Sequence, residues 1–130
     1  FFDKSKKILL ENIIHPKIQK KKEKFIKKYR ILNKKKVVMD IPLIFETNSE
    51  KKFDKIVVVW APNRILKTRA LRRENMSLKK LDAILESQAP QNYKILKADL
   101  SLPTSLGIFE TRKRIIRWMK KEFLKWDISF

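Results

Sequence analysis

The chain has 130 residues, 43% of them hydrophobic, and a formal net charge of +19 at pH 7. This length fits one domain with a real core, and the absence of cysteine excludes disulfides, thiol catalysis and cysteine-based zinc sites. His15 is the only histidine, so a histidine-rich metal site is excluded as well. The excess of Lys and Arg favours an anionic partner (nucleic acid, anionic lipid or a phosphorylated small molecule), although background composition explains the charge equally simply.

The N-terminal third of the chain is predicted to be helical. Apolar residues recur at helical spacing over residues 5–30, and Pro16 predicts a kink or a break near His15 because proline lacks the backbone donor. Residues 17–36 are rich in Lys. This run fits either a solvated helix face with a loop or a strip that binds polyanions.

Three short strands are predicted further along. Residues 37–41 and 56–60 are continuous apolar runs, which are typical of strands buried on both faces of a parallel sheet. Residues 99–102 are predicted to form a third strand. Pro103 would keep it short, because proline cannot donate to a sheet ladder.

Helices are predicted between and after these strands. Pro62 suits the first turn of a helix over residues 64–75, and Ser77 is a good N-cap for the helix that follows. Residues 90–98 are predicted to form another helical turn, and residues 108–126 a final amphipathic helix. Strands separated by helices indicate parallel βαβ units and therefore an α/β fold.

Two carboxylates follow the first predicted strand. Residues 37–46 (VVMDIPLIFE) read as an apolar strand that ends at Asp40, then a proline-marked exit that carries Glu46. Ligands of parallel α/β sheets bind outside the carboxyl ends of the strands. We therefore expect Asp40 and Glu46 to lie near a ligand.

One phosphate-binding device is missing from the sequence. Gly107 is the only glycine, which excludes the GxGxxG and GxxxxGK[ST] loops. No stretch approaches the roughly 18 uncharged apolar residues of a membrane-spanning helix, and no signal peptide is visible.

Several segments, in order, resemble the dephospho-CoA kinase family. Residues 40–46 (DIPLIFE) resemble its Asp-x-Pro-Leu-Leu-Phe-Glu signature, and residues 10–16 (LENIIHP) resemble its Leu-Glu-x-Ile-x-His-Pro segment. Further matches are residues 54–59, Arg69 and Arg73 followed by residues 76–77, residues 88–90 with Lys94 and residues 98–99, and residues 110–112. The shared order and spacing of these matches carry the resemblance.

The resemblance implies a P-loop kinase fold, in which three layers surround a parallel sheet and a helical lid is mobile. It implies a cytoplasmic enzyme that transfers the γ-phosphoryl group of ATP to the ribose 3′-hydroxyl of dephospho-CoA, with Mg²⁺. This is the last step of CoA synthesis. The chain would be a single partial kinase domain with these parts: a helical segment on the CoA-binding side (1–35), core strands (36–62), a helix and lid (63–98), and the last strand with the C-terminal helix (99–130).

The resemblance also implies roles for individual residues. Arg69 and Arg73 would stabilise charge on the transferred phosphates, and their spacing of one helical turn would let both face the same group. Gln88 and Lys94 would belong to the ATP side of the lid. Asp40 would also help to hold Mg²⁺ through water. The substrate would be bound by His15, Asp40, Pro42, Phe45 and Glu46.

Most of these residues have a structural interpretation as well. His15 fits a packed or capping residue, Asp40 a cap of the adjoining loop, Phe45 a core residue and Glu46 a surface acid. The two arginines fit solvated helix charges. The sequence leaves both interpretations open.

The sequence also departs from the family pattern. The family's P-loop and its first acidic motif would lie before Phe1, so we expect the chain to be inactive alone and its general base to be absent. Asn48 and Asn75 stand where the family commonly has glycine, but asparagine tolerates left-handed turns.

A second class of function is a basic module that binds nucleic acid or another polyanion. It would use residues 17–36, with Tyr29, Trp60 and Trp118 as stacking residues. No helix-turn-helix, zinc-finger or RNA-recognition signature supports it. We expect dephospho-CoA and ATP as partners, with no specific nucleic acid and no membrane, and the oligomeric state stays undetermined.

Overall fold

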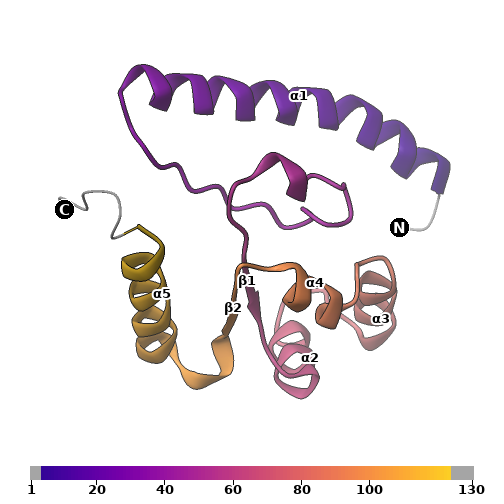
Figure 1. Ribbon diagram of the computed structural model, residues 1–130. Helices are drawn as coiled ribbons and strands as arrows, with labels where there is room; N and C mark the ends of the chain where they lie inside the picture. The colour runs from indigo at the N-terminus through magenta and orange to yellow at the C-terminus, as the bar shows by residue number, and fades with distance from the viewer. Residues whose placement is uncertain (1–3, 124–130) are drawn as a thin grey trace. The chain divides into compact units, whose positions relative to one another are not determined.

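The computed structural model describes residues 4–123. The chain divides into two compact units, with the boundary between Ile41 and Pro42. The first unit contains one long helix, and the second contains a pair of strands with the remaining helices (Figure 1). In chain order the elements are α1 (Lys4–Ile31), the 3₁₀ turn η1 (Glu50–Lys52), β1 (Val57–Trp60), α2 (Asn63–Leu71), α3 (Leu78–Glu86), α4 (Gln91–Lys97), β2 (Leu100–Pro103), the 3₁₀ turn η2 (Thr104–Leu106) and α5 (Ile108–Phe123).

Helix α1 runs through Pro16 without a break. Proline removes one backbone hydrogen bond from a helix, but the 28 residues of α1 leave many others intact. The break predicted near His15 is therefore absent. The helix ends with Leu32 N–H bonded to the Lys28 carbonyl at 3.1 Å, followed by Asn33 at a φ of 52°.

The strand predicted for residues 37–41 is wrong for the described structure. Residues 36–41 have no regular secondary structure, and the described residues form one sheet, made of β1 and β2 alone. A strand needs a neighbour to pair its backbone groups, and the apolar character of a run does not supply that neighbour. Val38 accordingly stays 88% exposed.

Strands β1 and β2 are parallel, as predicted, with Val57 opposite Leu100 and Trp60 opposite Pro103. Asp99 fixes the start of this register. Its carboxylate accepts a hydrogen bond of 2.8 Å from the Ile56 N–H and forms an ion pair of 3.1 Å with Lys55. Because Lys55 also pairs with Glu122 of α5 at 3.2 Å, the same contact joins the C-terminal helix to the strands.

The core of the second unit is small. Its buried hydrophobic residues are Phe45, Ala61, Leu81 and Leu102. Helix α5 lies on one side of the strands, with α2, α3 and α4 on the other (Figure 1). We predicted that the second strand would be buried throughout, but Val59 is 65% exposed. Successive side chains of a strand point to opposite faces. In β1 the described residues partly cover Val58 and Trp60, whereas Val57 and Val59 on the other face are exposed.

Local signals at the turns are confirmed. The Ser77 side chain accepts a hydrogen bond from Lys80 N–H and caps α3, as predicted. Asn48 and Asn75 have φ of 48° and 57°, the left-handed conformation that glycine or asparagine adopts at low cost. One boundary differs, because α2 ends at Leu71 rather than near Asn75.

Candidate active site

A hollow of about 480 Å³ runs along one face of α2, from Pro62 near the carboxyl end of β1 to Arg72 just past the end of the helix. Three of its lining side chains are arginines, and none is acidic. The hollow is lined by Pro62, Arg64, Ile65, Thr68, Arg69 and Arg72. Several guanidinium groups along one face of the helix that follows a parallel strand suit the binding of phosphate oxygens.

Arg69 is held in place by the segment that follows β2. Its guanidinium donates to the Thr104 hydroxyl at 3.0 Å and to the Thr104 carbonyl at 3.1 Å. The Thr104 hydroxyl in turn donates to the Trp60 carbonyl at 3.1 Å. This chain of bonds connects Arg69 to Trp60, the last residue of β1, through Thr104, the residue just after β2, so the cation is fixed relative to the sheet.

Arg73 does not share a helix face with Arg69. Helix α2 ends at Leu71, and Arg73 lies in the turn that leads to Asn75. The predicted arrangement on one helical turn is therefore wrong, and Arg73 is not among the residues that line the hollow. The arginines that line the hollow together with Arg69 are Arg64 and Arg72. The sequence signal that could have identified Arg64 and Arg72 is their location after the end of β1 and Pro62, within or directly after the helix that follows.

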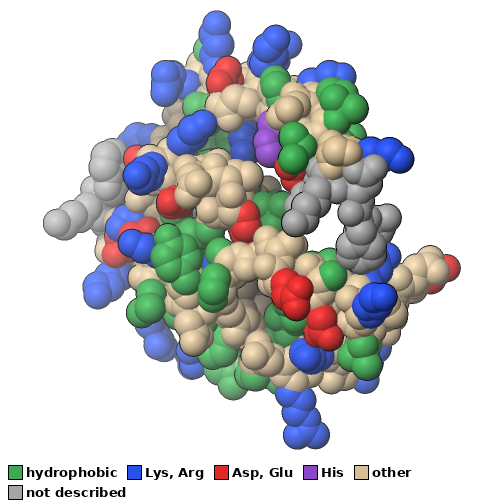
Figure 2. Space-filling model, turned by 90° about the vertical axis from the view of Figure 1, so that its right-hand side faces the viewer, with side chains coloured by type: hydrophobic (Ala, Val, Ile, Leu, Met, Phe, Trp, Pro, Cys, Tyr) green, Lys and Arg blue, Asp and Glu red, His purple; other side chains and the backbone are tan. Residues whose placement is uncertain are grey.

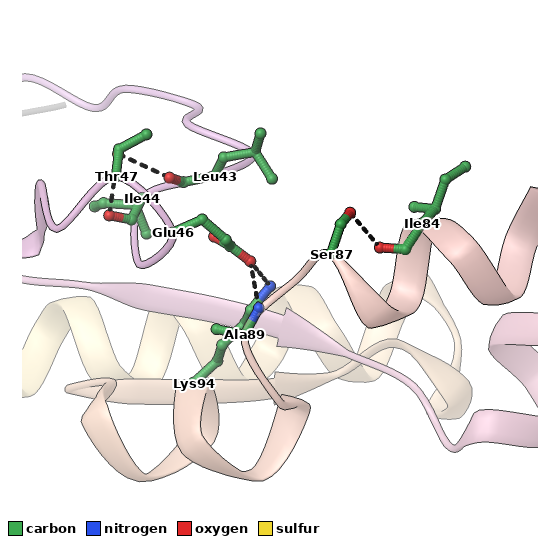
Figure 3. Close-up of polar contacts among 8 residues, drawn as sticks. All are labelled: Leu43, Ile44, Glu46, Thr47, Ile84, Ser87, Ala89 and Lys94. Carbon is green, nitrogen blue, oxygen red and sulfur yellow. Dashed lines mark hydrogen bonds and ion pairs between the residues drawn. The ribbon is translucent and has the colours of Figure 1, made fainter. Parts of the chain in front are cut away.

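Glu46 and Lys94 form the most enclosed ion pair among the described residues. The two charged atoms are 2.6 Å apart, and the side chains are only 14% and 16% exposed. The same carboxylate oxygen accepts a hydrogen bond of 2.9 Å from Ala89 N–H, as Figure 3 shows. The turn that carries Glu46 is thus bound to the connection between α3 and α4.

The surroundings of Glu46 lower its pKa. Burial raises the pKa, but the hydrogen bond from Lys94 and those from backbone N–H groups outweigh burial, so the pKa lies below its ordinary value. The other carboxylate oxygen, Oε2, is buried and has no hydrogen-bond partner within the described part of the chain. Glu46 is therefore charged and oriented, and its Oε2 atom is available to accept a hydrogen bond.

The turn formed by residues 42–48 also contributes an aromatic contact. The Phe45 ring is 7% exposed and meets the Tyr93 ring edge-on, with centroids 6.0 Å apart. Thr47 closes the turn by donating to the Leu43 carbonyl at 2.8 Å (Figure 3). Phe45 and Glu46 thus both fasten this turn to α4, while Pro42 is exposed at its beginning.

The remaining predicted residues take no part in the contacts described above. Gln88 is partly buried in the connection between α3 and α4, and its N–H bonds to the Leu85 carbonyl at 3.2 Å. His15 on α1 and Asp40 are exposed and belong to the first unit. The described residues hold no group of three or more His, Cys, Asp or Glu side chains that could enclose a metal ion.

The structure gives little support to a stacking surface. Trp118 packs edge-on against Phe123, with centroids 5.6 Å apart. The indole Nε1 of Trp60 is buried. On the face drawn in Figure 2, Lys and Arg side chains are visible at many separate places among other side chains.

Parallel strands joined through helices, with a cationic hollow along α2, are the features of an α/β protein suited to anionic ligands. The chain belongs to the dephospho-CoA kinase family, because the model of that family, described as dephospho-CoA kinase, matches residues 1–110. The family resemblance drawn from the sequence is confirmed.

Curated relatives agree with this assignment. The chain is 42% identical to a dephospho-CoA kinase of Bartonella henselae over 123 residues, which cover 95% of the chain and 63% of that protein. It is 41% identical to the Bartonella quintana protein of the same name, covering 87% of the chain and 58% of the relative. For the Rhizobium etli protein the identity is 39%, and the coverage is 82% and 53%. The chain thus spans between about half and two thirds of each relative's length.

Proposed function

We propose that this chain supplies part of an enzyme that makes CoA from dephospho-CoA in the cytoplasm. The ribose 3′-hydroxyl oxygen attacks the γ-phosphorus of ATP, the bond from that phosphorus to the β,γ-bridging oxygen breaks, and ADP leaves. The hydroxyl proton passes to a base that we do not assign to this chain. The observation that carries the proposal is the family match over residues 1–110.

The arginine hollow supports a role in phosphate binding. Phosphoryl transfer depends on cations placed around the phosphates, because charge spreads over their oxygens in the transition state. We assign this role first to Arg69, which Thr104 orients, and next to Arg64 and Arg72 beside it. Arg73 remains a proposed contact from the turn after α2.

The turn of residues 42–48 is the proposed support for the nucleotide-like substrate. Glu46 and Phe45 fix this turn to α4, and Pro42 with His15 would complete the contacts that the family resemblance implies. Lys94 is engaged with Glu46. We propose that Lys94 and Gln88 belong to the lid, and that Lys94 reaches a phosphate only when the pair with Glu46 opens.

The described residues fit only part of a Mg²⁺ coordination shell, in which substrate phosphates and waters supply the other ligands. Asp40 is one exposed carboxylate, and no cluster of metal-binding side chains exists within residues 4–123. Mg²⁺ in kinases is commonly held by one or two carboxylates together with substrate phosphates and waters. Asp40 would hold the ion through water, and the ion would neutralise charge on the ATP phosphates.

Two assays test this proposal. Alone, with ATP, Mg²⁺ and dephospho-CoA, the chain should form no CoA above background, because it lacks a phosphate-binding glycine loop. Joined to the part of the Bartonella henselae relative that it does not match, it should form CoA, measured by chromatography of the products. A hybrid that folds, binds ATP and yet never phosphorylates dephospho-CoA would overturn the assignment.

Binding measurements separate this function from the polyanion alternative. A kinase-type site should prefer dephospho-CoA to an oligonucleotide of similar charge. A general polyanion surface should bind both ligands. Its affinity for each of them should fall steeply, and by a similar factor, as the salt concentration rises. Calorimetric titration of both ligands at two salt concentrations distinguishes the two outcomes.

A further inference from the structure

The outward face of α5 forms a second basic depression, remote in sequence from the arginine hollow. It has a volume of about 480 Å³. Its residues recur three and four positions apart, so they occupy one face of the helix, and none of them is acidic. The lining residues are Phe109, Arg112, Lys113, Ile116, Arg117 and Lys120.

Large apolar side chains project at the N-terminal end of this face. Leu106 is 54% exposed, Ile108 is 79% exposed and Phe109 is 85% exposed. Gly107, between them, has a φ of 86° that turns the backbone sharply from η2 into α5. Ile116 continues the apolar surface two turns along the helix and is 41% exposed. A solvated charged face does not require such projections, whereas contiguous apolar patches mark contact sites.

The cations of this face are not neutralised by close ion pairs. None of Arg112, Lys113, Arg117 and Lys120 makes an ion pair within 4.0 Å in the described part of the chain. Glu110, at the flank, is paired with Arg114 at 2.8 Å, and its charge reaches Lys113 and Arg117 more weakly. The face therefore keeps a strong positive charge beside its apolar tip.

We propose that this face of α5 docks on an anionic lipid bilayer, with Leu106, Ile108 and Phe109 entering the interface and the four cations meeting the headgroups. Basic side chains beside protruding apolar ones are the composition of surfaces that lie on membranes. No helix within the described residues is long and apolar enough to cross a bilayer. The sequence argued against a membrane on that ground, but peripheral docking needs no spanning helix.

A lipid surface suits this face better than the other anionic partners do. Single-stranded nucleic acids bind by stacking bases on aromatic side chains. Phe109 is the one aromatic side chain among the three, and aliphatic Leu106 and Ile108 cannot stack. Of the three apolar residues only Phe109 lines the depression, and Leu106 and Ile108 are exposed outside it, where they would not contact an acidic peptide bound within it. Binding of either alternative partner is an outcome of the test below.

Sedimentation with vesicles tests the proposal directly. The chain should bind vesicles of phosphatidylcholine mixed with phosphatidylserine and not vesicles of phosphatidylcholine alone. The double variant Arg112→Glu/Lys113→Glu should bind roughly tenfold or more weakly, and Ile108→Ser/Phe109→Ser should also lose binding. The matched control, Lys51→Glu/Lys52→Glu on η1, has the same net charge as the first variant and should lose much less. Circular dichroism confirms that each variant is folded.

A single fluorophore tests insertion. The chain has no cysteine, so Ile108→Cys and Lys51→Cys each give one labelling site for an environment-sensitive dye. Only the dye at position 108 should shift to shorter wavelength with anionic vesicles. The proposal is overturned by equal loss in the charge-matched control, by no shift at position 108, or by charge reversal in residues 17–36 abolishing binding while the α5 variants bind normally. Binding of RNA or an acidic peptide to the same residues, without vesicle binding, also overturns it. These outcomes leave the proposed kinase function untouched.

Discussion

The guanidinium of Arg69 donates to both the hydroxyl and the carbonyl oxygen of Thr104, a residue 35 positions away in the chain. Thr104 also donates to the Trp60 carbonyl. One hydroxyl therefore determines where a cation of the candidate phosphate site lies relative to both strands. This relationship makes Thr104 a positioning residue, because it acts through Arg69.

Replacing Thr104 by Val should loosen Arg69. The change removes the hydroxyl at nearly constant volume and leaves the Trp60 carbonyl without its donor. We expect unfolding free energy to fall by about 0.5–1.5 kcal/mol and affinity for tripolyphosphate to fall several-fold. Thr104→Ser, which keeps the hydroxyl, should retain both properties. Urea denaturation and calorimetric titration measure the two effects, and equal behaviour of the two variants would remove the positioning role.

The three arginines of the hollow should contribute more to phosphate affinity than Arg73 does. A charge-assisted hydrogen bond contributes about 1.5–3 kcal/mol, so Arg72→Ala should weaken tripolyphosphate binding about tenfold. Arg73→Ala is the matched control one position away, with the same loss of charge, and should have a smaller effect. If both variants lose affinity equally, the ranking of Arg72 above Arg73 is wrong, and the turn after α2 contributes as much to phosphate binding as the hollow does.

The Glu46–Lys94 pair should make stability depend on pH in the acid range. The pKa of Glu46 is lowered in the folded chain, so the folded state binds its proton less readily than the unfolded state does. The pair's contribution is complete above the unfolded pKa, near 4.5, and is lost as pH falls through the lower folded value. Glu46→Gln should cost roughly 1–3 kcal/mol at pH 7 and should flatten the unfolding free energy between pH 5 and 3, approximate limits set by the general behaviour of carboxylates.

Glu110 supplies the control for this pH profile. Its pKa is also lowered, chiefly by the hydrogen bond from Arg114, but that pair is exposed on one helix. Glu110→Gln should therefore leave the acid branch of the stability curve nearly unchanged. A steeper change in Glu110→Gln than in Glu46→Gln would contradict the assignment of the acid branch to the enclosed pair.

Asp99 should contribute to strand register mainly through the Ile56 N–H. Burial raises the pKa of Asp99, but the backbone hydrogen bond from Ile56 and the ion pair with Lys55 outweigh it and lower the pKa. Asp99→Asn keeps an acceptor oxygen and should cost less than roughly 1 kcal/mol, since the ion pair is partly exposed. Asp99→Ala orphans the N–H and should cost more. Chemical denaturation in low and high salt separates the two contributions, because only the ion pair is screened.

The sequence predicted features that depend on a few neighbouring residues. Ser77 caps α3, and Asn48 and Asn75 adopt left-handed turns, because each outcome follows from local hydrogen bonding and sterics. The strand predicted at residues 37–41 did not form, because pairing is a property of two segments and no single segment encodes it. Likewise, α2 ends at Leu71, so Arg73 lies outside the helix that carries Arg69. The end of a helix does not depend on a single residue, which makes it hard to predict from the sequence.

Candidate site residues divide in the same way. The sequence singled out Glu46 and Lys94, but only the structure shows that they pair at 2.6 Å, because the residues come from segments distant in the chain. Thr104 carried no signal of its own. Its importance comes from its position after β2, where the Arg69 side chain and the Trp60 carbonyl converge on it.

The near absence of glycine has a consequence for the denatured chain. Asn33, Asn48 and Asn75 have positive φ, where many proteins use glycine. An asparagine has fewer accessible backbone conformations than a glycine when the chain is unfolded, so each of these turns loses less entropy on folding. The turns therefore combine a small strain in the native state with a less disordered starting state.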